Sequence, residues 1–299
     1  MLSTPRLWNS LYVSSRNGMV LASQSTLIST WLGRSGNLPL SIKIVEMALP
    51  DPKQEQDFVN AFVPFTPQIK DLMMFTPQSM IQRLIGNQDI SRLTDLKIAI
   101  TNDGDSGQPL NISDSATRMC NLSIMQYGFG LDTLHFPWAQ LTEFDVTSPS
   151  LNGCFSIFRQ CHNLSRLHLG GISGWYDGVT RPRVLMPNLV SLELNLHEMD
   201  IGCMWNNLTL PRLQEGNFAF LIEDSWQKSE LFALLDRSSC SLCTLHIPND
   251  ISEEDLVECV ERIPSLRNVI WGSWDDKSPL PDRVSRILEQ RAASAMNVD

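Results

Sequence analysis

The stretch that decides the fold is Leu189-Val190-Ser191-Leu192-Glu193-Leu194, in which the first, fourth and sixth residues are apolar. Polar residues flank the middle leucine, so the side chains alternate between a dry and a wet side with the period of a β-strand. The stretch therefore predicts a strand with one solvent-facing side. The same pattern recurs at Leu93–Ile98, Leu141–Val146, Leu164–Leu169, Leu242–Ile247 and Leu266–Trp271.

The pattern returns at nearly constant spacing, most often every 24 residues, which is the arithmetic of a repeat protein. A repeat of this length predicts an α/β leucine-rich-repeat solenoid over residues 39–277. We expect an irregular horseshoe with parallel strands on the concave face and helices or loops outside. The predicted strand centres are Leu72, Leu96, Cys120, Phe144, Leu167, Leu192, Gly216, Leu245 and Val269.

Segments with helical spacing lie between the predicted strands. Ser252 is a good N-cap, acidic residues fill the next turn, and Leu256, Cys259, Val260 and Ile263 follow at i, i+3, i+4 and i+7. Pro264 then predicts the end of this helix. Residues 278–299 form a similar pattern, with apolar Val284, Ile287 and Leu288 and the stem of Arg291 on one side. We expect this segment to be a capping helix and tail that covers the last strand near Trp271.

Composition narrows the function classes. The chain has 299 residues, 23 Lys and Arg against 33 Asp and Glu, and a formal net charge of −10. Such an acidic chain disfavours binding to nucleic acid or an anionic membrane. No apolar run approaches the roughly 18 residues of a membrane helix, and the seven scattered cysteines suit buried reduced thiols. These features predict a cytoplasmic or nuclear protein.

The N-terminal residues carry a family resemblance. Pro5-Arg6-Leu7-Trp8 resembles the Pro-x-Leu-Trp element that ends an F-box, and Trp31–Ile42 resembles a junction of the large F-box-like families of mushroom-forming fungi. The resemblance identifies residues 1–38 as an F-box remnant and linker helix. The residues themselves predict a helix that ends at Trp31-Leu32, Gly36 as its left-handed C-cap, and a strand through Ile42 and Ile44. It implies the substrate receptor of a Skp-cullin-F-box ubiquitin ligase. In the family, the helices that bind the Skp-type adaptor precede Pro5, so we expect adaptor binding only if those helices are present.

No motif predicts catalysis, a cofactor or a metal centre. Cys240-Ser-Leu-Cys243 with His246 has metal-like spacing, but it falls on a predicted strand and no second zinc-binding pair follows. Asp103-Gly104-Asp105 is interpreted as a solvated turn because the remaining ligands of a calcium loop are missing. A non-enzymatic recognition module is therefore the leading hypothesis. A stand-alone repeat scaffold without ligase docking is the alternative, and an enzyme with an unrecognised site is a remote third.

Because the sequence predicts no catalytic, cofactor or metal site, we expect the concave face of the solenoid to be the functional surface. The polar positions beside the strand centres hold six acids against two bases, so a protein partner, basic in character, is expected. The candidate partner-binding residues are Lys97, Asp145, Arg166, His168, Glu193, Asn217 and His246.

The core prediction can be tested by truncation. Replacing Leu167 or Leu192 with Ala is expected to lower the free energy of unfolding by about 2 to 5 kcal/mol, because each change leaves a cavity among the strands. Urea denaturation of the purified variants measures the change. A loss below about 1 kcal/mol at both positions would contradict burial of these leucines.

Overall fold

The structure is a computed structural model, and its described residues are 4–14, 22–45, 52–101, 109–125, 131–172, 182–196, 202–220, 226–247, 251–272 and 278–296. The fold is α/β, with a parallel sheet of 11 strands and eight α-helices within these residues. The chain divides into two compact units, Met1–Val146 and Thr147–Asp299, each described here by itself. The Asp103–Asp105 turn lies outside the described residues.

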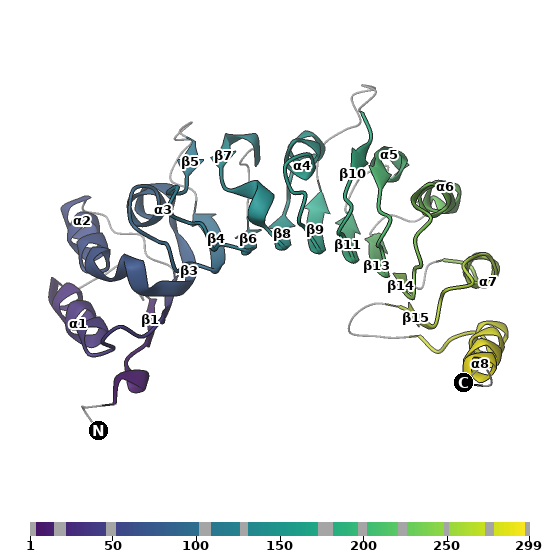
Figure 1. The fold of residues 1–299 in the computed structure, drawn as a ribbon, viewed down its shortest axis with the longest axis horizontal. Coiled ribbons are helices and arrows are strands. Elements are labelled where there is room, and N and C mark those ends of the chain that lie inside the picture. The colour runs from purple at the N-terminus through teal and green to yellow at the C-terminus, as the bar shows by residue number, and fades with distance from the viewer. Residues whose placement is uncertain are drawn as a thin grey trace. The chain divides into compact units, whose positions relative to one another are not determined.

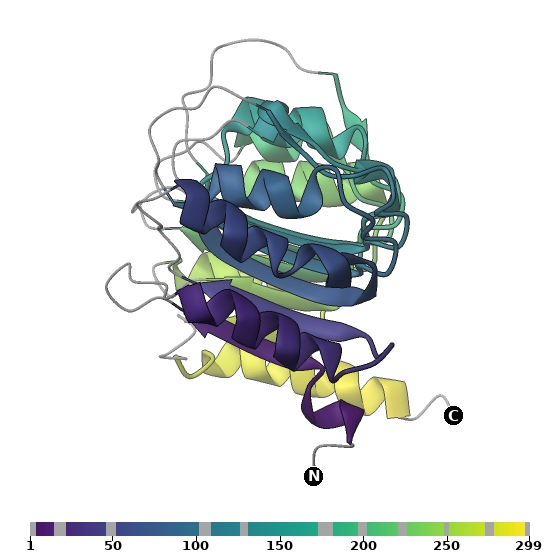
Figure 2. The same ribbon diagram turned by 90° about the vertical axis from the view of Figure 1, so that its left-hand side faces the viewer.

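The first unit is built on strands in the order β1-β2-β3-β4-β6-β8. Its helices lie on one side of the strands (Figures 1 and 2). The strands are β1 (Ser10–Ser14), β2 (Leu40–Val45), β3 (Ile69–Pro77), β4 (Asp95–Thr101), β6 (Asn121–Met125) and β8 (Glu143–Thr147). The helices are α1 (Ala22–Gly33), α2 (Pro52–Asn60) and α3 (Gln78–Ile85), and a small parallel pair joins β5 (Leu110–Asn111) to β7 (Leu134–His135).

The second unit repeats the arrangement with the strand order β9-β11-β13-β14-β15. The strands are β9 (Arg166–Ile172), β11 (Ser191–Leu196), β13 (Glu215–Phe220), β14 (Thr244–Ile247) and β15 (Asn268–Trp271). The helices are α4 (Leu151–Phe158), α5 (Gly202–Asn207), α6 (Lys228–Ser238), α7 (Glu253–Arg262) and α8 (Asp282–Met296). A second short parallel pair joins β10 (Val184–Leu185) to β12 (Leu208–Thr209).

The strand ladder expected from the sequence is confirmed at eight of its nine centres. Leu164, Leu167 and Leu169 are all buried, and Leu167 pairs in parallel register with Leu192, which pairs with Gly216. Similar residues thus stand side by side on neighbouring strands and share one apolar layer. The predicted cap of the α7 helix is also confirmed, because the Ser252 hydroxyl accepts a hydrogen bond from the amide of Asp255 at 3.1 Å.

The centre placed at Cys120 was wrong by two residues. Leu96 pairs with Leu122, and strand β6 begins only at Asn121, after Cys120. The apolar triplet of this repeat is therefore Met119, Leu122 and Ile124, all buried. A spacing of strictly 24 residues favoured Cys120 as the strand centre, and this choice put polar Thr117 at a core position. The burial of Met119, Leu122 and Ile124 shows that the centre is Leu122.

The N-terminal residues are part of the sheet, contrary to the expectation that the ladder starts after them. β1 pairs in parallel with β2, from Ser10 opposite Ser41 to Ser14 opposite Val45. The expected helix, its left-handed Gly36 (φ 63°) and the strand through Ile42 and Ile44 are confirmed. The sequence did not predict β1, because Ser-Leu-Tyr-Val-Ser lacks the apolar triplet of the other strands. A strand at the end of a sheet has a neighbour on one side only and is commonly less apolar.

Gly216 stands at a core position of its strand, where the neighbouring strands have Leu192 and Leu245, although glycine has no side chain to bury. The packing of a nearby aromatic ring explains this. The ring of Phe218, two residues on, lies over Gly216, so that a Cβ there would come within 2.9 Å of two ring carbons. Phe218 is itself buried and meets Trp205 edge to face at 5.5 Å between ring centroids. An aromatic side chain therefore fills the volume that leucine occupies at the equivalent position of the next strand.

Two arginines join successive helices of the second unit. Arg237 of α6 donates to the carbonyl oxygens of Trp205 and Leu208, at and just past the end of α5. Arg291 of α8 donates to Val260 at 2.6 Å and to Ile263 at 3.0 Å, at the end of α7. Each guanidinium satisfies carbonyl groups that a helix C-terminus leaves without a partner. The last helix is thus held by a charged cap on α7 as well as by its apolar side, on which Val284 is buried.

Three of the cysteines are interior side chains. Cys154, Cys161 and Cys259 are buried, and burial raises the pKa of each thiol to about 12. These three thiols stay protonated at neutral pH and are poor nucleophiles. None of the helices formed by the described residues has the length and apolar character needed to cross a bilayer.

The Arg291 cap yields a prediction for the C-terminal helix. Arg291→Met keeps the aliphatic stem but removes the donors, so we expect the free energy of unfolding to fall by about 2 kcal/mol. The matched control is Arg286→Met on the same helix, because Arg286 is exposed and its one bond to the described residues goes to the carbonyl of Asp282 within α8. Deleting residues 279–299 removes the cap altogether and should also promote association. Equal melting temperatures for the Arg291 and Arg286 variants would contradict the capping role.

Candidate functional site

The solvent-facing side of the first unit carries its polar side chains in rows, because parallel pairing places equivalent residues side by side. We call Ser41, Asp71, Asp95 and Asn121 the carboxylate row, and Lys43, Met73, Lys97 and Ser123 the lysine row. Residues two apart on a strand lie about 6.6 Å apart, and neighbouring strands lie about 4.8 Å apart. Acids and bases therefore form two adjacent lines across the same strands.

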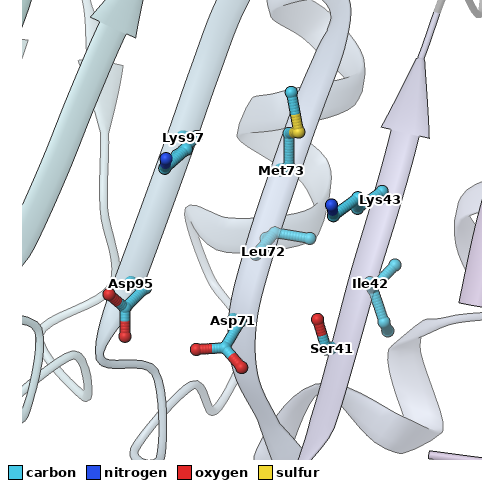
Figure 3. A pocket seen from close by; sticks show the side chains of 8 residues that line it. All are labelled: Ser41, Ile42, Lys43, Asp71, Leu72, Met73, Asp95 and Lys97. Atoms are coloured by element: carbon cyan, nitrogen blue, oxygen red, sulfur yellow. The ribbon is translucent and has the colours of Figure 1, made fainter. Parts of the chain in front are cut away.

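A depression of about 280 Å³ lies where the two rows cross β2, β3 and β4. Figure 3 shows Asp71 and Asp95 beside each other at one end of it, and Lys43 and Lys97 on either side of Met73 at the other. We call this depression the paired-charge pocket. Its lining residues are Ser41, Ile42, Lys43, Asp71, Leu72, Met73, Asp95 and Lys97.

The carboxyl group of Asp95 is held by its neighbours. Thr94 donates to one of its oxygens at 2.5 Å, and Asn121 donates to the other at 2.6 Å. Partial burial works to raise the pKa of Asp95, but these hydrogen bonds outweigh it and lower the pKa below its ordinary value. Asp95 is therefore a fixed negative charge at neutral pH.

Asp71 behaves in the opposite way although it stands directly beside Asp95. Partial burial raises the pKa of Asp71, Lys70 at 3.7 Å lowers it less, and the adjacent Asp95 raises it further. Two carboxylates on neighbouring strands resist ionising together. Asp71 is thus the group that takes up a proton first, or that benefits most when a cation approaches.

The two pocket lysines are available to a ligand. Both are exposed, and neither forms an ion pair within the part of the chain that the structure describes. The carboxylates are oriented by Thr94, Asn121 and Lys70, so they leave the ammonium groups of Lys43 and Lys97 uncommitted. The pocket thus has a negative end and a positive end.

The expected partner-binding residues fall on this side of the strands in each unit, and all but one of them are exposed or half-buried. Lys97 lines the pocket, and Asp145 accepts a hydrogen bond from Ser123 at 2.9 Å. In the second unit, Nε2 of His168 lies 3.6 Å from Glu193 and 3.2 Å from the amide of Asn195. Exposed Arg166 on β9 and half-buried Asn217 on β13 complete the set.

His246 is the exception, because it is buried. Its Nε2 lies 2.9 Å from the carbonyl oxygen of Gly272, so this nitrogen carries the proton and donates. His246 stands in the same row as Asn217, but it is only 5% exposed, so it offers almost no surface to a partner. Among the residues that the structure describes, no three His, Cys, Asp or Glu side chains are placed to hold a metal ion.

The N-terminal residues Pro5–Trp8 pack on the body of the first unit. Pro5–Leu7 forms a short 3₁₀-helix, and the ring of Trp8 meets Trp31 edge to face at 4.5 Å between centroids. The guanidinium of Arg34 lies 4.8 Å from the Trp8 ring centroid, within the range of a cation–π contact. Leu7 remains 58% exposed, so its apolar side chain faces solvent.

Sequence reasoning missed Lys43 as a site residue. The ladder was started at Leu72, yet Ile42-Lys43-Ile44 already shows the strand alternation. Extending the row of polar positions by one strand would have added Lys43, which lies on the other side of Met73 from Lys97. The pairing of Asp71 with Asp95 was contained in the ladder, but their electrostatic coupling was not evident from spacing.

Comparison with known proteins adds no assignment. No protein-family model matches the chain, and no curated protein matches it at a significant level.

The carboxyl pair yields a pH-dependent prediction. Asp71→Asn removes one of two adjacent charges, so we expect the protein to gain about 0.5 kcal/mol at about pH 7, a small effect because both groups are partly solvated. The gain should vanish as the pH falls through the raised pKa of Asp71, where the wild-type group is already neutral.

Asp95→Asn is the matched control and should behave oppositely. The lowered pKa of Asp95 means that its ionised form stabilises the fold above the ordinary carboxyl range, and that this contribution is lost as the pH falls. Thermal melts of both variants between about pH 3 and about pH 7 measure the two profiles. A stabilised Asp95→Asn protein at neutral pH would contradict the assignment of the two carboxyl groups.

Proposed function

We propose that the protein is a non-enzymatic recognition module of the leucine-rich-repeat type, which binds another protein with the open side of its strands. The observation that carries the proposal is the asymmetry of the first unit. Helices lie on one side of its strands, while the other side presents rows of charged and polar groups with a depression among them (Figures 1 and 3). Repeat folds of this kind commonly use such a surface for binding.

The finer proposal is that the partner is a substrate of a Skp-cullin-F-box ubiquitin ligase. Its support is the resemblance of Pro5–Trp8 and Trp31–Ile42 to F-box-like proteins, together with the packing of Trp8 against Trp31. A rigid joint between the F-box end and the repeats would hold a bound protein in a constant position relative to the ligase. The ligase chemistry itself would be supplied by other subunits.

Site-specific photocrosslinking tests the proposal. Met125 is 44% exposed on the polar side of β6, and Leu27 is 65% exposed on helix α1, so both accept a benzoylphenylalanine side chain at little cost to packing. In cells that carry the full-length protein, we expect crosslinks to a discrete partner from position 125 and none to that partner from position 27. Equal crosslinking from both positions would contradict recognition by the strand surface.

The crosslinked partner then distinguishes ligase receptor from scaffold. We expect it to be ubiquitinated in a reaction reconstituted with the full-length protein, a Skp-type adaptor and a cullin ligase. A partner that crosslinks from position 125 but is not ubiquitinated would instead establish a stand-alone scaffold.

A further inference from the structure

The charges of the paired-charge pocket indicate the chemistry of the segment it binds, an inference that rests on the proposed function. We propose that it binds an extended segment of the partner protein that presents a basic side chain and, two residues away, an acidic side chain. The basic group would lie on Asp71 and Asp95, and the acidic group between Lys43 and Lys97.

Spacing supports an extended segment. In an extended chain, side chains two residues apart lie on the same side and about 6.6 Å from each other. The carboxylate and lysine rows are separated by the same two-residue step, because Asp71 and Met73 belong to one strand, as do Asp95 and Lys97. A strand-like segment lying along β3 would therefore place its alternate side chains over successive rows.

Charge complementarity supports the order of the two groups. Asp95 is a fixed anion whose oxygens are oriented by Thr94 and Asn121, and a bound cation would relieve its repulsion with Asp71. At the other end, Lys43 and Lys97 flank Met73 on the neighbouring strands (Figure 3), and they form no ion pairs among the described residues. An acid lying over Met73 can reach both ammonium groups at once.

A row of apolar side chains lies two residues past the lysine row and would contact the next part of the bound segment. Beyond the lysine row, the same strands present Val45, Phe75, Ala99 and Met125 side by side. The first three are half-buried and Met125 is exposed. A partner segment with an apolar residue two positions past the acid would cover this third row.

Labelled peptides test the spacing of the two charges. The probes are blocked peptides of the patterns Gly-Arg-Ala-Glu-Gly and Gly-Glu-Ala-Arg-Gly, with Gly-Arg-Glu-Ala-Gly as a control of equal composition. We expect one or both of the spaced peptides to bind, and the control, whose charges point to opposite sides, to bind about tenfold more weakly. Fluorescence anisotropy at low salt gives the affinities, which should fall as ionic strength rises.

A charge reversal guards against variants that merely fail to fold. The double variant Lys43→Glu with Lys97→Glu should lose the spaced peptides and gain binding of Gly-Arg-Ala-Arg-Gly, a result that an unfolded protein cannot give. The control Lys53→Glu, on helix α2, should leave all affinities unchanged. Equal affinity for spaced and control peptides, or no switch in the double variant, would overturn the assignment.

The outcomes also separate this inference from the proposed function. If no peptide binds while position 125 still crosslinks a partner, the pocket assignment fails and the recognition function stands. If neither experiment gives a partner, both fail. Displacement of the spaced peptides by free arginine and glutamate together, at concentrations comparable to the peptides, would identify a small-molecule site and overturn the segment proposal.

Discussion

Pairing in register is the constraint on which each unit depends. A single repeat consists of one strand and one helix or loop, which is too little to bury its own apolar side chains. These side chains are buried only when neighbouring repeats pack beside it. In the second unit, Leu167, Leu192 and Gly216 stand opposite one another, and the layer is continuous only because the Phe218 ring covers the glycine. A shift of one residue on any strand would turn its apolar set toward solvent.

The same register creates the chemistry of the open side. Parallel pairing brings Asp71 beside Asp95, although 24 residues separate them in the chain. The alternation of the strand places Lys97, two residues after Asp95, on the same side. Asp71 has an ion-pair partner in its own strand, Lys70 at 3.7 Å, whereas the carboxyl group of Asp95 is held by hydrogen bonds from Thr94 and Asn121. The fold thus holds like charges together, and Thr94, Asn121 and Lys70 offset part of the cost.

The helices of the second unit are held together by hydrogen bonds and ion pairs from arginine and lysine side chains. Arg237 and Arg291 each donate to carbonyl oxygens around the end of the preceding helix, and Lys228 of α6 bonds both Asp255 and Glu258 of α7. These two carboxylates raise the pKa of Lys228, chiefly through their hydrogen bonds. Charged contacts between consecutive helices complement the apolar layer, so short helices such as α5 can be used without strong intrinsic stability.

The sequence by itself determined the repeat, the position of eight of nine strand centres, the α7 cap and the buried leucines, because alternation and spacing report local geometry directly. It did not determine the strand β1, whose Ser-Leu-Tyr-Val-Ser pattern is too weak, or the frame at Leu122, where regular spacing competed with burial. Tertiary structure alone decided that His246 is buried and that the carboxyl groups of Asp71 and Asp95 influence each other's pKa. Those properties depend on which strands become neighbours and on what lies beyond each side chain, and no local pattern encodes either.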